Sequence, residues 1–392
     1  MYLNESFVQV IKIMRAKVLF LIGIILLCVS CKDSSKRTIG SEVYKVNLND
    51  VVNPFDEVFS KAEIIPLETS ELGLLSDMQK INMVGGNLYI YDFMFQTLTV
   101  FDQTGKFIQR IGKRGQGPED YLNMYDCYID IGKKKIYSLS VFGTIKQYQI
   151  DGTFEEDIVL PARPNYYSIA LLDDRYIATW SCLMFEEEGS LGIVDRLSGD
   201  TIGTYWHDDP MFNFRLLYPF HRYENKTFFS TALRQQVYEV TPKGLFPAYS
   251  WDFGKDNIGE STLKHYLDIE DINDRNLAII EDCGSDRLPF CLREQRQNKK
   301  YSYVALKRDM NLRPPLTHVF YDKTNHRGYA FDELADGCRM NYPLYFGEDF
   351  ILTDVFYENR EQYKSILPES EYKKLENMKE DDNPCLLKLY FK

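Results

Sequence analysis

Residues 88–112 read LYIYDFMFQTLTVFDQTGKFIQRIG and carry the clearest structural signal in the chain. Three short runs rich in β-branched and aromatic residues, at 88–92, 98–102 and 107–112, are separated by the short segments FMFQT and QTGK. The segment between the second and third runs is QTGK, a composition typical of a tight turn. Short runs of this kind, bounded by Gly, Asp and Asn, predict strands joined by hairpins.

The same unit recurs in weaker form along the chain, with further starts near residues 135, 176, 226, 301 and 350. Apart from one wider gap, the starts lie roughly 40–50 residues apart, which is the length of a four-stranded propeller blade. This repetition predicts an all-β propeller rather than a sandwich or a parallel α/β fold. The spacing alone is compatible with six or with seven blades.

Three further segments complete the expected architecture. The wide gap contains residues 257–282, whose apolar residues have helical spacing, so we expect a short helical insertion there. Residues 368–380 predict a second short, charged helix. The last run, 385–391, is suited to closing the ring by pairing with an N-terminal strand, either 42–48 or 62–67.

The N-terminus has the pattern of an export signal. Two basic residues precede an uncharged apolar run of 13 residues, 18–30. That length lies within the roughly 7–15 residues of a signal-peptide core and is too short to span a bilayer. Small Ser30 precedes Cys31, and the sequence becomes polar immediately afterwards.

We therefore expect a lipoprotein signal peptide over residues 1–30, a lipid on Cys31, and a tether over residues 31–41. The propeller then occupies residues 42–392. The expected location is the outer membrane, with the cell surface and the periplasmic face both open. A plain membrane anchor and an ordinary secretion signal are the alternatives, and either Met1 or Met14 suits translation start.

The composition restricts the partners. Removing residues 1–31 takes away three basic residues and one acidic residue, so the net charge changes from −12 to −14. This charge argues against nucleic acid, which requires a basic surface, and against direct contact with an anionic membrane. The 28 Tyr and 25 Phe residues favour strands, and Tyr also suits surfaces that contact carbohydrate or protein.

Six cysteines remain after Cys28 and Cys31 are set aside, and no CxxC spacing occurs among them. A zinc site is therefore not expected, and no motif indicates another metal or a cofactor. Cys283 and Cys291 flank one loop-like stretch, CGSDRLPFC, and form the best candidate for a disulfide, since export permits disulfides. The alternative is a pair of buried thiols.

The glycine-rich segment 112–121, GKRGQGPEDY, is the most distinctive loop. It could bind a ligand through its backbone amides, a positive charge and an aromatic stacking face. The candidate binding residues are Arg114, Gln116 and Tyr121. In the alternative interpretation, Gly115 and Gly117 adopt positive φ in a tight connection between blades that Pro118 stiffens.

Four stretches also carry a resemblance to a known family: 64–69 (IIPLET), 100–121, 251–255 (WDFGK) and 382–384 (DNP). On these residues the chain resembles the six-bladed β-propeller lipoproteins of Bacteroidetes, which are related to NHL-repeat propellers. The likeness extends over about residues 42–392. It implies six blades and an envelope location, and it implies no reaction, because that family has no established activity.

Motifs of catalytic propellers and hydrolases are absent from the sequence: it has no Asp box, no GxSxG, no HxH and no HExxH. The leading hypothesis is a non-catalytic binding protein for a glycan, a peptide or a partner protein, with its site at the channel mouth. The alternatives are an enzyme acting on extracellular polysaccharide through carboxylates at the funnel, and a structural component of an envelope complex.

Overall fold

The computed structural model describes residues 42–161, 165–181, 190–205, 219–310 and 315–392. Residues 43–392 form one compact unit. The expected signal peptide, Cys31 and the tether lie outside the described residues. Within these ranges, no helix has the length and apolar character needed to cross a membrane.

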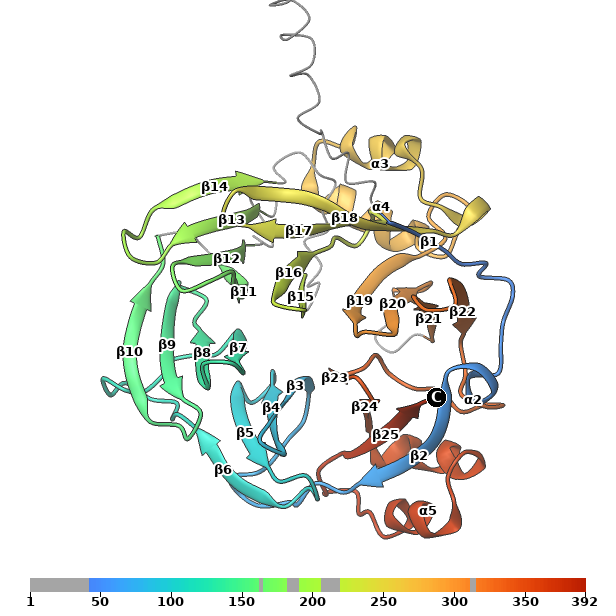
Figure 1. The fold of residues 1–392 in the computed structure, drawn as a ribbon, viewed down its shortest axis with the longest axis horizontal. Helices are drawn as coiled ribbons and strands as arrows, with labels where there is room; N and C mark the ends of the chain where they lie inside the picture. The colour runs from blue at the N-terminus through green and yellow to red at the C-terminus, as the bar shows by residue number, and fades with distance from the viewer. Residues whose placement is uncertain (1–41, 162–164, 182–189, 206–218, 311–314) are drawn as a thin grey trace, which may run out of the picture. The chain divides into compact units, whose positions relative to one another are not determined.

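Residues 43–392 form a ring of six antiparallel sheets, which confirms the predicted six-bladed β-propeller (Figure 1). The innermost strands of blades one to six are β3 (Met78–Val84), β7 (Asp126–Asp130), β11 (Tyr166–Leu171), β15 (Phe220–Tyr223), β19 (Cys291–Gln297) and β23 (Tyr345–Phe346). The second strands are β4 (Asn87–Asp92), β8 (Lys135–Leu139), β12 (Tyr176–Ser181), β16 (Lys226–Phe229), β20 (Tyr301–Lys307) and β24 (Phe350–Val355).

Two more strands complete each blade. The third strands are β5 (Thr97–Phe101), β9 (Thr144–Gln149), β13 (Ser190–Asp195), β17 (Gln236–Thr241), β21 (Leu316–Asp322) and β25 (Cys385–Phe391). The outer strands are β6 (Phe107–Ile111), β10 (Phe154–Val159), β14 (Thr201–Tyr205), β18 (Gly244–Asp252), β22 (Arg327–Phe331) and β2 (Phe59–Ile65). The units recognised in the sequence are therefore the second strands of the six blades.

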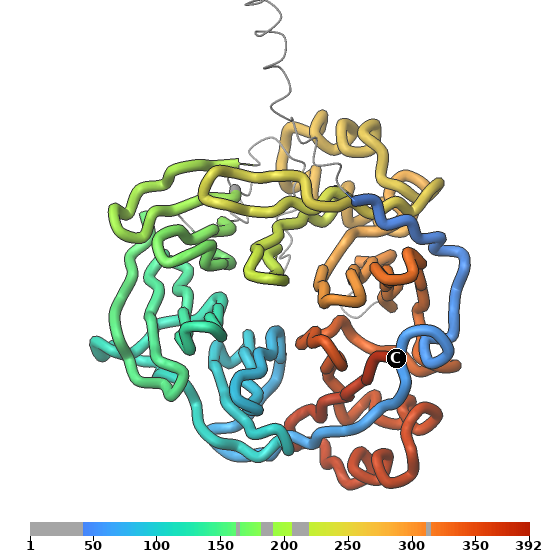
Figure 2. The backbone as a smooth tube through the Cα atoms, in the orientation of Figure 1, coloured from blue at the N-terminus to red at the C-terminus, as the bar shows by residue number. Residues whose placement is uncertain are grey.

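Blade six closes the ring by joining the two ends of the chain (Figure 2). Its third strand, β25, pairs with β2 in antiparallel register from Phe59↔Phe391 to Ile65↔Leu386. Of the two predicted partners, the segment 62–67 is confirmed. The segment 42–48 is not the partner, because β1 (Glu42–Lys45) adds instead as a fifth strand to β18 of blade four.

The helical insertion predicted at 257–282 is confirmed. It contains α3 (Glu260–Leu267) and α4 (Ile272–Asp282), which lie between blades four and five, and α4 begins where the Asp271 side chain accepts the N–H groups of Asn273 and Asp274. The second predicted helix is α5 (Glu369–Glu376). Shorter helical turns occur at α2 (Pro54–Glu57) and η1 (Gly254–Asp256), and a 3₁₀ segment, η2 (Tyr357–Ser365), precedes α5.

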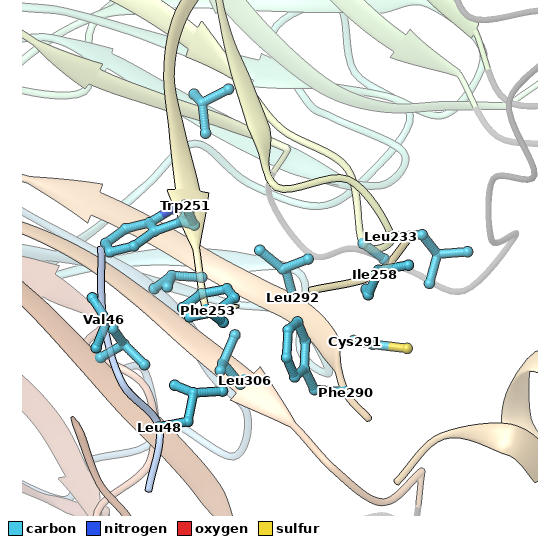
Figure 3. Close-up of a cluster of buried hydrophobic side chains, with 14 of the residues drawn as sticks. Val46, Leu48, Leu233, Trp251, Phe253, Ile258, Phe290, Cys291, Leu292 and Leu306 are labelled. Atoms are coloured by element: carbon cyan, nitrogen blue, oxygen red, sulfur yellow. The ribbon is translucent and has the colours of Figure 1, made fainter. Parts of the chain in front are cut away.

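The insertion and the segment after β1 share one hydrophobic cluster with blades four and five (Figure 3). Val46, Leu48 and Trp251 of β18 lie on one side of this cluster, and Leu233 and Cys291 lie on the other. The Trp251 indole donates to Gln295 Oε1 at 3.0 Å, which satisfies its polar atom inside the core. The N-terminal segment is therefore part of the folded ring.

The glycine-rich loop differs from the interpretation based on positive φ. Gly112 has φ +65°, whereas Gly115 and Gly117 are not in the left-handed region. A Cβ on Gly115 would clash with the Asp120 carboxylate, and the Gly117 N–H donates to Asp120 Oδ2 at 3.0 Å. These two glycines therefore permit a close approach of Asp120 rather than a left-handed turn.

Cys283 and Cys291 are free thiols in contact with one another. Cys283 Sγ also donates to the Lys307 carbonyl at 3.3 Å. The hydrogen bond from Cys291 lowers the pKa of Cys283, while the same contact and burial raise the pKa of Cys291. The disulfide between them stays a prediction.

Candidate functional site

A cavity of about 410 Å³ is lined by residues from the innermost strands of all six blades. These strands surround the axis of the ring (Figure 1). We call this cavity the axial pocket. Its walls come mainly from the C-terminal halves of these strands and from the turns that follow. Its cationic and tyrosine residues are Lys80, Tyr128, Arg222, Tyr223, Arg296 and Tyr345.

The first cation of the axial pocket, Lys80, is neutralised. It forms an ion pair with Asp126, whose side chain is fully buried. Asp126 also accepts the Ser168 hydroxyl at 2.7 Å and the Ile169 N–H at 3.0 Å. One carboxylate thus joins the inner strands of blades one, two and three, so the pair is a structural element of the ring.

The second cation, Arg296, is neutralised within its own strand. It lies 2.8 Å from Glu294, whose side chain is only 4% exposed. Isolated buried charges are very unfavourable, so each member of this pair requires the other. Arg296 also donates to the Gln295 carbonyl at 2.9 Å, which fixes its direction.

The third cation, Arg222, differs from the other two. Among the described residues, no carboxylate lies within ion-pair distance of it. Its guanidinium donates to the Tyr128 hydroxyl and lies 5.6 Å from the centre of that ring. Partial loss of hydration lowers the pKa of Arg222, but an arginine still keeps its charge. The axial pocket therefore presents one uncompensated positive charge beside an aromatic face.

His221 lines the same pocket but is part of its scaffold. Burial lowers the pKa of His221 to about 3, so the ring is neutral at physiological pH. Its Nε2 accepts from Gln297 at 3.2 Å, and the ring stacks on Phe228 at a centroid distance of 5.1 Å. Over the part of the chain that the structure covers, no group of three or more His, Cys, Asp or Glu residues is arranged for a metal ion.

The sequence-predicted binding residues do not line the axial pocket. Arg114 and Tyr121 line a second cavity of about 810 Å³ beside β6. This cavity, the rim groove, is formed chiefly by Leu72, Leu74, Phe95, Thr97, Ile108, Arg110, Lys113, Arg114 and Tyr121. Gln116 is exposed and lines neither cavity. Tyr121 is only 3% exposed, so its ring packs in the core and does not offer the expected stacking face.

A family model described as "Domain of unknown function (DUF4934)" matches residues 43–390, which is the whole ring. The chain belongs to the DUF4934 family. No curated protein matches the chain.

Two solved structures show the same fold as this DUF4934 ring. A "Putative exported protein" from Bacteroides fragilis NCTC 9343 is 18% identical, with a TM-score of 0.71, covering 89% of this chain and 99% of that one. A member of the DUF4221 family from Bacteroides vulgatus ATCC 8482 is 10% identical, with a TM-score of 0.53, covering 86% and 98%. These findings confirm the expected resemblance to propellers of Bacteroides at the level of the fold.

Sequence reasoning missed every residue of the DUF4934 axial pocket. The recognised repeats are second strands, whereas Lys80, Arg222 and Arg296 lie on the preceding strands of their blades. Those inner strands carry weaker patterns, because polar residues that face the channel interrupt the apolar runs. The innermost strands of a propeller surround its central channel. A search of the strand that precedes each recognised repeat would therefore have identified these three residues.

Proposed function

We propose that this protein is a lipid-anchored binding protein of the cell envelope whose axial pocket takes the acidic group of a saccharide. Arg222 carries the proposal, because it is the pocket's cation without a carboxylate partner among the described residues. A guanidinium binds carboxylate or sulfate through paired, charge-assisted hydrogen bonds. An acidic saccharide would supply the missing negative charge.

The size and aromatic content of the axial pocket support a saccharide. About 410 Å³ lies within the range of small-molecule sites, roughly 300–1,000 Å³, and suits a ligand far smaller than a folded partner. Tyr128, Tyr223 and Tyr345 are each half-buried at its wall. Tyrosine combines an apolar face with a polar edge, which suits the C–H faces and hydroxyl groups of a sugar.

The carboxylates near the pocket support binding rather than hydrolysis. A glycosidase needs a protonated carboxyl and a free carboxylate on opposite sides of the scissile bond. Here Asp126 and Glu294 are held in buried ion pairs. At the mouth, Asp130 accepts the Lys133 N–H at 3.0 Å and Glu224 accepts the Tyr223 hydroxyl at 2.9 Å. Each of these acids is already engaged by the protein.

The envelope location rests on the signal pattern before Cys31 and is supported by the exported neighbour of the same fold. Several acyl chains on one cysteine would hold the protein at a membrane essentially permanently, since each buried CH₂ contributes about 0.8 kcal/mol. Labelling of the full chain with an alkyne fatty acid should be lost in Cys31→Ala. Equal labelling of both proteins would remove the anchor from the proposal.

The binding proposal is tested by calorimetric titration of the propeller domain, residues 42–392, with trigalacturonic acid and with neutral maltotriose. We expect saturable binding of the acidic trisaccharide only, weakened about tenfold or more in Arg222→Gln, as for loss of a charge-assisted contact. Arg327→Gln, which alters an exposed arginine of blade five, is the matched control and should bind normally. Equal affinities of Arg222→Gln and the unaltered domain would contradict the proposal, and cleavage of the trisaccharide would favour the enzyme.

A further inference from the structure

The rim groove follows a sheet edge whose first N–H group is occupied, since the Phe107 N–H donates to Glu68 Oε2 at 2.9 Å. It contains four consecutive residues of β6, Phe107 to Arg110, and β6 is the outermost strand of blade one, hydrogen-bonded only to β5 in the sheet. An edge strand presents unpaired N–H and C=O groups along its length. An extended chain can therefore pair with β6, as the chain's own β1 does with β18 at the outer edge of blade four.

The groove also carries uncompensated positive charge. Arg110, Lys113 and Arg114 line it, and Glu71 is its one acidic lining residue. Within the described ranges, none of the three cations belongs to an ion pair. Arg114 Nε donates to the Leu122 carbonyl at 3.2 Å, so its side chain is held in place but its charge is not neutralised. Three neighbouring cations without ion-pair partners among the described residues are unexpected on a chain of net charge −12. Their arrangement is complementary to a ligand that carries carboxylates.

Polar atoms buried in the groove wall lack partners as well. The Thr97 hydroxyl, the Tyr121 hydroxyl and Arg110 Nε make no hydrogen bond to any described residue. Thr97 is 4% exposed and Tyr121 is 3% exposed, so neither hydroxyl has open access to bulk water. An unsatisfied buried polar group costs about 1–3 kcal/mol, so such groups usually indicate a missing partner. Arg110 and Arg114 both interact electrostatically with Tyr121, and Thr97 lines the same cavity.

Apolar side chains form the rest of the groove. Leu72, Phe95 and Ile108 are 57%, 44% and 45% exposed, although large apolar residues are normally buried. A cluster of exposed apolar residues beside cations marks an interaction surface more than a solvated face. The occupant therefore combines apolar side chains with acidic groups.

We infer that the rim groove binds an extended, acidic and apolar peptide segment of a partner protein, which adds as a strand to β6 and places a carboxylate between Arg110 and Arg114. Strand addition uses the sheet edge for affinity and the side-chain contacts for selectivity. A membrane is the less suitable occupant, because a bilayer offers no extended backbone that could pair with the edge of β6.

The test uses a fluorescent array of ten-residue peptides that alternate Val, Leu or Phe with Glu, measured by anisotropy against the propeller domain. We expect saturable binding by members of this array and none by the versions with Gln or Lys in place of Glu. Arg110→Gln and Arg114→Gln should each weaken the best peptide by about tenfold, as for an interfacial charge contact. Arg222→Gln in the axial pocket should leave peptide affinity unchanged, so this result is independent of the saccharide proposal.

Strand addition has a signature of its own. N-methylation of alternate peptide residues should abolish binding in one register and preserve it in the other, because only every second N–H of an added strand faces β6. If peptides N-methylated in either register bind equally well, strand pairing with β6 is excluded. The inference is also overturned if no acidic peptide of the array binds at millimolar concentration, or if vesicles with anionic lipid bind through Arg110 and Arg114 in place of the peptides.

Discussion

The axial pocket and the rim groove each contain three cationic residues, but the two sets are in different electrostatic states. In the axial pocket, Lys80 and Arg296 face buried carboxylates and Arg222 alone is uncompensated. In the rim groove, all three cations lack an ion-pair partner among the described residues. A cation with a buried acidic partner holds the ring together, whereas a cation without one is available to a ligand. Substitutions in the two sets should therefore separate stability from binding.

The largest effect should come from breaking the buried pair at Asp126. Asp126→Asn leaves Lys80 without its counter-ion in the interior, which typically costs about 3–5 kcal/mol. Urea unfolding at pH 7.5 measures this change. Glu361→Gln, at an acid that is 81% exposed, is the control and should change stability by no more than about 0.5 kcal/mol. A loss in Asp126→Asn as small as that of the control would show that the pair is not structural.

Acidic pH should destabilise the protein through His221, the buried histidine that lines the axial pocket. The pKa of His221 is about 3 when folded and near 6.5 when unfolded, so the unfolded chain binds the extra proton at intermediate pH. The stability contributed by the neutral ring is present above pH 6.5 and is lost as the pH falls towards 3. Between pH 7.5 and pH 5 this loss is about 2 kcal/mol. Over the same pH range, the unfolding free energy of His221→Gln should fall by about 2 kcal/mol less than that of the unaltered protein. An identical pH dependence of the two proteins would contradict the assignment to His221.

A smaller effect is expected in the rim groove. Lys113→Gln removes an exposed cation that has no ion pair in the described structure and relieves repulsion from Arg114. The unfolding free energy should change by no more than about 0.5 kcal/mol. Arg296→Gln is the contrasting variant, because it leaves the buried Glu294 without its counter-ion. Its unfolding free energy should decrease by about 3–5 kcal/mol. Thermal and urea unfolding of the two variants measure this difference. Similar losses of stability in both variants would contradict the distinction between the two sets of cations.

The smallest effect is expected at Gln116, which the sequence placed in a binding site. Its side chain is exposed and lines neither cavity. Gln116→Ala should leave the unfolding free energy and both ligand affinities unchanged within error. A clear loss of peptide or saccharide affinity would restore the loop tip as a binding element.

Much of the fold could be predicted because local chemistry repeats. Strands β4, β5 and β6 alternate with turns such as that after Asp102, whose carboxylate accepts the N–H groups of Thr104 and Lys106. The choice of closing strand could not be predicted, since 42–48 and 62–67 have similar patterns. Their partners, β18 and β25, are selected by the geometry of the closed ring rather than by local sequence.

The binding sites could be predicted only in part. The glycine-rich loop contributes Arg114 and Tyr121 to the rim groove, but the same cavity also needs Thr97 of β5 and Leu72 of the segment before β3. Binding by Arg114 and Tyr121 stays a prediction. The axial pocket gave only a weak local signal, because the folded ring brings together short segments of six strands that are distant in the sequence. The pairing of Lys80 with Asp126 joins two blades and follows from their packing alone.

A crystal structure of residues 42–392 with trigalacturonic acid would test the division between the two cavities most directly. We expect a saccharide carboxylate on the Arg222 guanidinium beside Tyr128, with the Lys80–Asp126 and Arg296–Glu294 pairs undisturbed. A saccharide bound at Arg110 and Arg114 with the axial pocket unoccupied, or one that displaces Asp126 from Lys80, would contradict it.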